Sequence, residues 1–142
     1  MSTATKRIQF DSSALVEAAF YEAFAQLDGS LMSQVWLDSE RVYCVHPGSG
    51  PLLGSEQVLN SWRSMFYQAA PVALFYRVIS SQVNSQMALH LVEEEISAAD
   101  GSHRALVMAT NCYLNTRQGW RLTGHHASAK ASTPQERSNL VH

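Results

Sequence analysis

The first part of the chain repeats apolar residues at helical spacing. Over residues 12–28 the apolar positions fall on one side of a helix, namely Val16, Phe20, Ala23, Phe24 and Leu27. Ser12 or Ser13 can accept hydrogen bonds from the first free backbone N–H groups of this helix, and the turn-forming pair Asp28-Gly29 ends it. The pattern predicts an amphipathic helix that buries one face.

A short second helix follows directly. Ser30 can cap it, and its apolar edge consists of Leu31, Met32, Val35 and Trp36. Residues 41–46 are rich in strand-forming types, whereas the run PGSGP at residues 47–51 cannot continue a strand. We therefore expect a helical hairpin, then one brief strand and a loop.

A third helix is predicted from Ser55, its expected N-cap, to about Ala70. Its apolar face is large and aromatic and comprises Val58, Leu59, Trp62, Met65 and Phe66. Because proline cannot continue a helix, Pro71 should end it.

From residue 73 onward the period changes from 3.6 to 2, which is typical of strands. Turn-forming residues interrupt this pattern at 84–85, 100–101 and 117–119. Four strands joined by short turns predict an antiparallel meander that ends near Ser128. Helices first and sheet last predict an α+β fold in which the helices cover one face of a curved sheet.

Composition adds limits to this picture. The 142 residues suit a single domain over 1–142, with a core at about 12–128 and a polar tail at 129–142. The net charge is −2 and the ten Lys and Arg residues are scattered, which argues against a nucleic-acid partner. No apolar run follows the N-terminal charges, so we expect neither a signal peptide nor membrane binding, and a cytoplasmic protein.

Six segments stand out by their order and spacing: VEAAFYEAF at 16–24, VW at 35–36, VYCVHPG at 42–48, SW at 61–62, ATNCY at 109–113 and GWRLTGHHAS at 119–128. Together they resemble SnoaL-like proteins, a branch of the nuclear transport factor two-like (ketosteroid isomerase-like) superfamily. The resemblance covers residues 12–128. It implies a cone-shaped, curved antiparallel (mixed) sheet wrapped around three N-terminal helices, a deep pocket at the open end, and a homodimer formed through the outer sheet face.

The resembled superfamily includes ketosteroid isomerase, scytalone dehydratase, limonene epoxide hydrolase and polyketide cyclases, and also transport factors and assembly domains without catalysis. The catalytic aspartate of the ketosteroid isomerases cannot be placed in this sequence. The Asp-Arg-Asp arrangement of the epoxide hydrolases is also missing. The fold therefore decides little about activity.

Candidate pocket residues come from several predicted elements. His46 ends the first strand just before the loop, where an imidazole can act as acid or base, or can instead hold its own loop. Trp62 and Phe66 lie one helical turn apart and, with Tyr43, can form an apolar pocket wall. For Trp36 we expect ordinary core packing.

The last strand carries two adjacent histidines that must point to opposite faces. A two-residue turn at 117–118 would pair Asn111 with Gly124, so that Asn111, Tyr113 and His126 share a face and His125 points away. The resemblance favours the face of Asn111 and His126 as the pocket lining, although a β-bulge would invert this assignment. A buried, hydrogen-bonded core histidine is the alternative to a catalytic one.

Other chemical groups carry weaker signals. Glu94 and His90 share one strand face, and Glu93 and Glu95 share the other; a buried Glu94 could act as a base, but such acidic runs are more often solvated or ion-paired. The histidines lack metal-ligand spacing, so we expect no metal and no cofactor. Two distant cysteines favour free thiols.

Two functions remain open from the sequence. The first is a pocket protein for a small apolar organic ligand, with acid–base chemistry of the isomerase, lyase or cyclase type. In it His46 and His126 are the catalytic candidates, and Tyr43, Trp62, Phe66, Asn111 and Tyr113 bind the ligand. The second is a non-catalytic homodimeric module for ligand binding or assembly.

Overall fold

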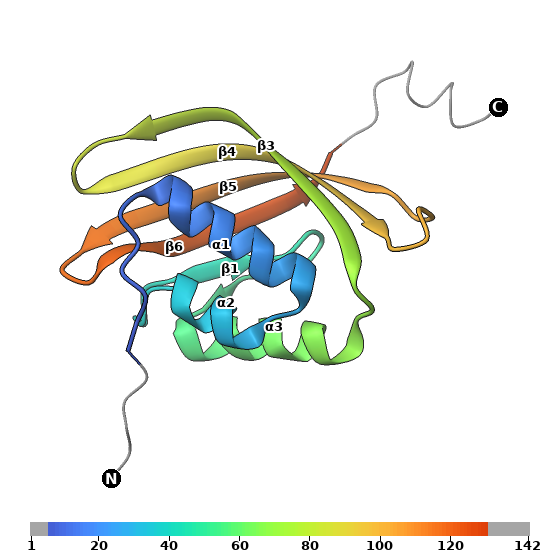
Figure 1. Cartoon of the computed structure of the whole chain (residues 1–142), viewed down its shortest axis with the longest axis horizontal. Helices are drawn as coiled ribbons and strands as arrows, with labels where there is room; N and C mark the ends of the chain where they lie inside the picture. Colours follow the sequence, from blue (N-terminus) through green and yellow to red (C-terminus); the bar gives the residue numbers. More distant parts are fainter. Residues whose placement is uncertain (1–5, 131–142) are drawn as a thin grey trace, which may run out of the picture.

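Three helices lie in the hollow of a curved sheet in the computed structural model of this chain, which describes residues 6–130 (Figure 1). The helices are α1 (Ser13–Gln26), α2 (Gly29–Val35) and α3 (Ser55–Gln68). The strands are β1 (Tyr43–Val45), β2 (Leu52–Leu53), β3 (Val72–Val83), β4 (Met87–Ala98), β5 (Ala105–Thr116) and β6 (Gly119–Ala129). The predicted α+β fold, with three helices against a curved sheet, is confirmed.

The strands form one open, mixed sheet in the order β2-β1-β6-β5-β4-β3. Strands β3 to β6 are antiparallel neighbours, as the predicted meander requires. β1 runs parallel to β6, and β2 pairs antiparallel with β1. The sequence did not predict β2, because two residues are too few to establish a period.

The helices α1 and α2 each begin directly after a short polar side chain. Ser12 accepts a hydrogen bond from the Leu15 backbone N–H at 3.1 Å and caps α1, which confirms one of the two predicted caps. Asp28, and not the predicted Ser30, caps α2 by accepting from the N–H of Leu31 at 3.0 Å. Both serve the same purpose, because a short side-chain oxygen satisfies an N–H group that the helix itself cannot pair.

The start of α3 differs from the prediction. Gly54 occupies the cap position with a left-handed φ of 84°, and no side chain caps the helix. Ser55 is the first helical residue, and its hydroxyl donates to an oxygen of Asp38 at 3.0 Å. Ser55 therefore ties α3 to the segment after α2 and does not cap α3.

Aromatic side chains fill the space between the helices and the sheet. Phe20 of α1 packs edge-on against Trp62 of α3 and Trp36, with ring centroids 5.5 Å and 6.5 Å away. All three side chains are fully buried, so Trp36 lies in the core as predicted. Burial of each such side chain contributes roughly 1.5–3 kcal/mol or more to stability.

One extra residue interrupts the pairing of β5 with β6. The turn pairs Thr116 with Gly119, as predicted. Farther along, Cys112 pairs with Gly124, so that Thr123 is left as a bulge on β6. Because side chains alternate strictly along a strand, every residue after the bulge faces the side opposite to the prediction.

The bulge exchanges the two histidines of β6. His125 pairs with Asn111, shares its inward face and is buried, whereas His126 pairs with Thr110 and is exposed on the outer face. The predicted placement of His126 in the pocket and of His125 away from it is therefore wrong. The physical reason is a shift of the register by one residue.

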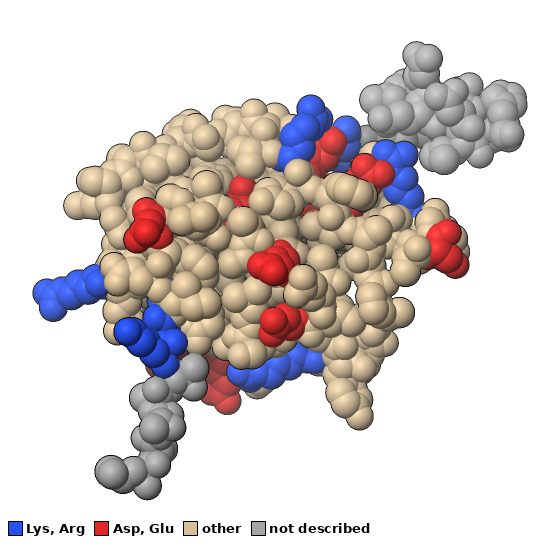
Figure 2. Space-filling view, viewed as in Figure 1, with Lys and Arg blue, Asp and Glu red and all other residues tan. Residues whose placement is uncertain are grey.

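Charged residues of both signs are dispersed over the face shown in Figure 2, with neutral surface between them. Within residues 6–130 no helix is both long and apolar enough to cross a membrane. Most of the predicted polar tail, residues 131–142, lies outside the described residues.

Candidate functional site

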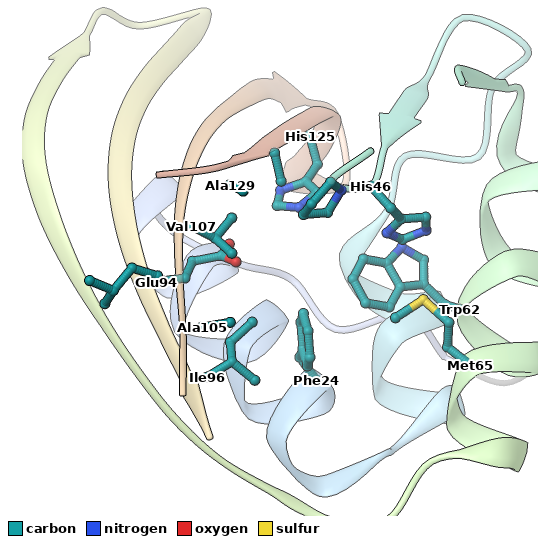
Figure 3. A pocket seen from close by; sticks show the side chains of 13 residues that line it. Phe24, His46, Trp62, Met65, Glu94, Ile96, Ala105, Val107, His125 and Ala129 are labelled. Atoms are coloured by element: carbon teal, nitrogen blue, oxygen red, sulfur yellow. The ribbon is translucent and has the colours of Figure 1, made fainter. Parts of the chain in front are cut away.

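A pocket of about 400 Å³ lies between α1, α3 and the inner face of the sheet (Figure 3). Its wall is largely apolar and includes Phe24, Trp62, Met65, Ile96, Val107 and Ala127. Three titratable side chains also line it: His46, Glu94 and His125. Pockets of this size and composition suit small organic molecules, with a few polar groups to orient them.

Strand alternation brings Glu94 into the pocket. Its neighbours on β4 point outward, where Glu93 lies 2.8 Å from the Lys130 ammonium and Glu95 lies 2.6 Å from the Arg104 guanidinium. Glu94 itself is 1% exposed. The predicted opposition of Glu94 to its two neighbours is confirmed, and only the outward pair has the ion-paired environment that is usual for acidic runs.

The Glu94 carboxyl group is poised near neutral pH. Burial raises its pKa to about 7, against a lowering by the hydrogen bond that the Tyr21 hydroxyl donates at 2.7 Å, and the Glu17 charge raises it further. Both protonation states are then populated at pH 7. A carboxyl group with this pKa can take a proton from a bound molecule and return it.

His125 enters the pocket from β6. Its ring centroid lies 5.0 Å from that of Phe20, and its Nδ1 lies 2.6 Å from Oδ1 of Asn111. Burial lowers its pKa to about 3, and positive charge on His46 and His126 would lower it further. The imidazole is therefore neutral at physiological pH and can serve as a hydrogen-bond partner.

His46 lines the same pocket from the end of β1. Its Nε2 lies 2.9 Å from the Ser61 hydroxyl on α3, and its ring lies 4.9 Å from the Trp62 ring. Burial lowers its pKa. The sequence left open whether this side chain faces the pocket or holds its own loop; the structure places it at the pocket and bonds it to α3.

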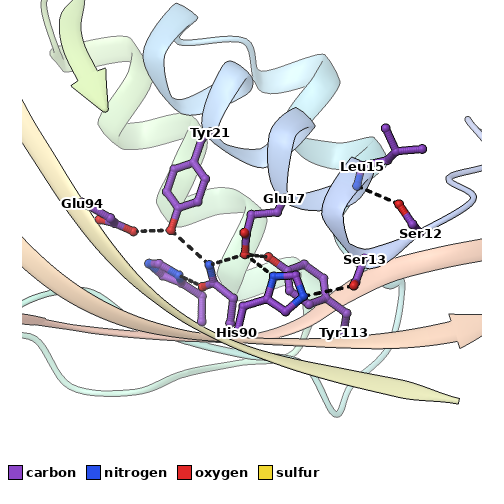
Figure 4. Close-up of polar contacts among 10 residues, drawn as sticks. Ser12, Ser13, Leu15, Glu17, Tyr21, His90, Glu94 and Tyr113 are labelled. Atoms are coloured by element: carbon purple, nitrogen blue, oxygen red, sulfur yellow. Dashed lines mark hydrogen bonds and ion pairs between the residues drawn. The ribbon is translucent and has the colours of Figure 1, made fainter. Parts of the chain in front are cut away.

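Behind the pocket, a buried polar network surrounds the carboxylate of Glu17 on α1 (Figure 4). Its Oε2 accepts hydrogen bonds from Tyr113 at 2.5 Å, from His90 at 2.9 Å and from Asn111 at 3.4 Å. The amide of Asn111 also donates to the Tyr21 hydroxyl at 3.0 Å. The network thus connects Glu17 to both pocket groups, through Asn111 to His125 and through Tyr21 to Glu94.

Part of the network has the distances of a nucleophilic triad. Ser13 lies 3.1 Å from Nε2 of His90, and the opposite nitrogen of that ring contacts Glu17 at 2.9 Å. Ser13 is only 3% exposed, however, and does not line the pocket. The three groups therefore satisfy one another in the interior and offer no room for a substrate.

Several ligand-binding candidates lie elsewhere. Cys44 of β1 points inward, so strand alternation places its neighbour Tyr43 on the outer sheet face. There the hydroxyl of Tyr43 lies 3.9 Å from the sulfur of Cys112. The predicted place of Tyr43 in the pocket wall is therefore wrong. Asn111 and Tyr113 face inward as expected but belong to the network behind the pocket.

Of the two candidates on α3, Trp62 and Phe66, only one lines the pocket. Trp62 lines the pocket, as predicted. Phe66 packs on Trp62 at 5.8 Å between ring centroids and is not part of the lining. Trp62 alone of this pair can contact a bound molecule directly.

The sequence did not single out Glu17, which is 2% exposed. A signal was present: Ser13, Glu17 and Tyr21 recur at intervals of four, so they form a polar stripe beside the apolar face of α1. Polar residues at that spacing on a core-facing helix indicate a buried network.

Metal and thiol chemistry find little support in this site. Over residues 6–130 no three His, Cys, Asp or Glu side chains are grouped closely enough to hold a metal ion. Cys44 and Cys112 are free thiols, as predicted. Burial raises the pKa of Cys44 to about 12, which disfavours the reactive thiolate.

Residues 14–132 match the family model of the SnoaL-like domain. The chain belongs to the SnoaL-like domain family. This SnoaL-like protein shares 31% identity with a candidate calcium/calmodulin-dependent protein kinase type II association domain from Thiobacillus denitrificans, with a TM-score of 0.83, covering 88% of the present chain and 100% of the other. No curated protein matches it significantly.

Two further solved structures are similar to this SnoaL-like protein. A candidate dehydratase of the NTF2-like family from Streptomyces avermitilis is 30% identical, with a TM-score of 0.75 and coverage of 84% of this chain and 94% of that one. A ketosteroid isomerase-like protein from Erwinia carotovora atroseptica is 18% identical, with a TM-score of 0.67 and coverage of 84% and 96%. The second likeness concerns the fold alone.

Proposed function

We propose that this SnoaL-like protein is an acid–base catalyst that moves a proton on a small, mostly apolar organic molecule, as in an isomerisation, dehydration or cyclisation. One observation carries the proposal: Glu94, with a pKa near neutrality, lines the same apolar pocket as the neutral imidazole of His125. Paired titratable groups with shifted pKa values in a pocket are a common feature of active sites.

Each pocket group has a distinct role in this proposal. Glu94 in its ionised form removes a proton from the substrate, and the hydrogen bond from Tyr21 to Oε2 leaves the other carboxylate oxygen for that task. His125 orients the substrate by hydrogen bonding, and His46 does so from the end of the neighbouring strand β1. The wall around them is largely apolar, and a low local polarity strengthens such interactions.

The lining also limits the substrate class. It contains no Lys or Arg side chain, and both of its histidines have lowered pKa values. An anionic ligand would therefore be buried without a counter-charge, which is costly. The proposed substrate is an uncharged organic molecule.

Kemp elimination of 5-nitrobenzisoxazole tests the proposal without knowledge of the natural substrate. A base removes the proton on carbon 3, the N–O bond breaks, and a coloured cyanophenolate forms. We expect turnover that rises with pH through about 7, since only ionised Glu94 accepts the proton. Glu94→Gln should reduce the rate at least about 100-fold, the usual minimum contribution of a general base.

The matched control is Glu95→Gln, which changes an ion-paired carboxylate on the outer face of the same strand. This variant should keep the wild-type rate and pH profile. Equal rates for Glu94→Gln and wild type, or a profile without a step near pH 7, would contradict the proposed role of Glu94.

We also propose that the protein is a homodimer that pairs through the outer sheet face. Alternate residues of β4 expose apolar side chains there, Met87, Leu89 and Leu91, and Phe75 of β3 adds a fourth. A row of exposed apolar residues commonly marks an interface.

The 31%-identical structure named as an association domain supports the alternative that assembly, and not catalysis, is the working function.

A further inference from the structure

The orientation of the Asn111 side chain follows from its neighbours. The amide NH₂ of Asn111 faces Glu17 and donates to its Oε2 at 3.4 Å. The same NH₂ donates to the hydroxyl of Tyr21. The carbonyl oxygen Oδ1 is then turned toward His125.

This orientation determines the tautomer of His125. Because Oδ1 of Asn111 can only accept, the ring nitrogen 2.6 Å away, Nδ1, must carry the proton. A neutral imidazole has one proton, so Nε2 carries a lone pair. His125 therefore offers the pocket a hydrogen-bond acceptor, in the tautomer that a histidine exposed to water favours less.

The direction of the hydrogen bond between Tyr21 and Glu94 follows in the same way. The oxygen of Tyr21 already accepts from Asn111, and burial raises its pKa above the usual value, so it keeps its proton. That proton is donated to Oε2 of Glu94 at 2.7 Å. The other oxygen of ionised Glu94 is likewise an acceptor.

We propose that Glu17, acting through Asn111, fixes the direction of hydrogen bonding so that His125 and ionised Glu94 both present acceptors, and that the pocket therefore selects ligands that carry O–H or N–H donors. Glu17 and Asn111 are positioning residues, because neither lines the pocket. The inference rests on the proposed function only in taking this pocket as the ligand site.

The tautomer of His125 can be read directly from long-range ¹H–¹⁵N NMR spectra of the full-length protein at pH 8, with His125→Gln to assign the signals. We expect the Nδ1–H form in the wild type. The Nε2–H form or a charged ring in the wild type would overturn the proposal, whatever the variants do.

Asn111→Leu removes the amide while nearly keeping its shape. In this variant His125 should shift to the Nε2–H form, and circular dichroism should confirm that the fold persists. Asn115→Leu, an exposed position on the same strand, should leave the spectrum of His125 unchanged. A folded Asn111→Leu protein that retains the Nδ1–H form would contradict the role of Asn111.

A matched pair of probes tests the ligand class. 2-Naphthol carries an O–H donor, and 2-methoxynaphthalene replaces that donor with a methyl ether. At pH 8 the wild type should bind 2-naphthol at least about tenfold more tightly, because its O–H pairs with a buried acceptor that the methyl ether leaves unpaired. Asn111→Leu should weaken this preference, because His125 then presents a donor and only Glu94 still presents an acceptor. Equal affinities in the wild type would overturn the selection of donors.

The two proposals can fail separately. If Kemp elimination does not depend on Glu94 while the tautomer and the probe preference are as expected, the proposed chemistry is wrong and the hydrogen-bond direction stands. If Glu94 catalyses the elimination but His125 is in the Nε2–H form, the reverse holds.

Discussion

His125 and His126 are adjacent in the chain and differ completely in their surroundings. His125 is buried against Phe20 and hydrogen-bonded to Asn111, whereas His126 is exposed on the opposite face. Loss of a buried hydrogen-bonded side chain leaves both a cavity and an unpaired partner. Substitution of His125 should therefore lower the free energy of unfolding much more than substitution of His126.

We expect His125→Ala to lower the free energy of unfolding by about 2–4 kcal/mol, since it also leaves Oδ1 of Asn111 without its partner. His126→Ala should change it by no more than about 0.5 kcal/mol. Urea unfolding followed by circular dichroism measures both. Comparable losses in the two variants would show that the register of β6 is not the one described.

Only some of the site residues were within reach of sequence reasoning. His46 and Trp62 were identified because each follows from a local pattern, a strand end and a helical face. Glu94 was correctly oriented by strand alternation, but its burial depends on packing against α1, to which no local pattern points. The spacing of Ser13, Glu17 and Tyr21 indicates a polar stripe on α1, but the hydrogen-bond partners of Glu17 lie more than 70 positions away in the chain and could not be identified from that stripe.

At the level of elements, the turn between β5 and β6 also anchors the segment before α1. The backbone N–H of Trp120 donates to the carbonyl oxygen of Phe10 at 2.9 Å. Gly119 precedes it with a φ of 96°, and a side-chain carbon there would lie 2.8 Å from the same oxygen. Both the backbone conformation and the close approach require glycine at this position.

Gly119→Ala should therefore lower the free energy of unfolding by about 3 kcal/mol, through strain at positive φ and displacement of the segment that contains Phe10. The control is Gly50→Ala, where φ is unstrained and a side-chain carbon would meet no atom within 4 Å. That change should be neutral within about 0.5 kcal/mol. Thermal or urea unfolding of both proteins decides, and equal stability of the two variants would contradict the anchoring role.

The same scale explains which elements the sequence could predict. α1, α3 and the four long strands span several repeats of their period, and α2, with seven residues, spans about two turns, so the hydrophobic pattern was sufficient to predict each of them. β2 has two residues and no such pattern. The bulge at Thr123 offsets the alternation of β6 by one residue, so that Leu122 and His125 both face inward, and no residue type in the strand marks where this extra residue falls.

For the whole molecule, the outer sheet face is the surface on which the proposed homodimer depends. Leu89→Glu places a charge in the middle of its apolar row and should convert a dimer to a monomer. Leu15→Glu is the matched control, because Leu15 is the same residue type and is 52% exposed against 41% for Leu89, but lies on α1. Size-exclusion chromatography with light scattering measures the mass of each. A monomeric wild type at micromolar concentration, or a dimer that Leu89→Glu leaves intact, would contradict the proposed interface.

The fold, the pocket and the network together give one carboxyl group, that of Glu94, a pKa near 7 inside an apolar pocket. The curved sheet turns Glu94 inward, α1 brings Tyr21 and Glu17 against it, and burial raises its pKa from the usual 4.5. The proposed catalysis depends on this property.

A ¹³C NMR titration of the glutamate side-chain carboxyl carbons, with Glu94→Gln to assign the signal, tests it most directly. We expect Glu94 to titrate with a midpoint near 7, well above the usual 4.5 of a glutamate side chain. A midpoint near 4.5 for Glu94 would contradict it.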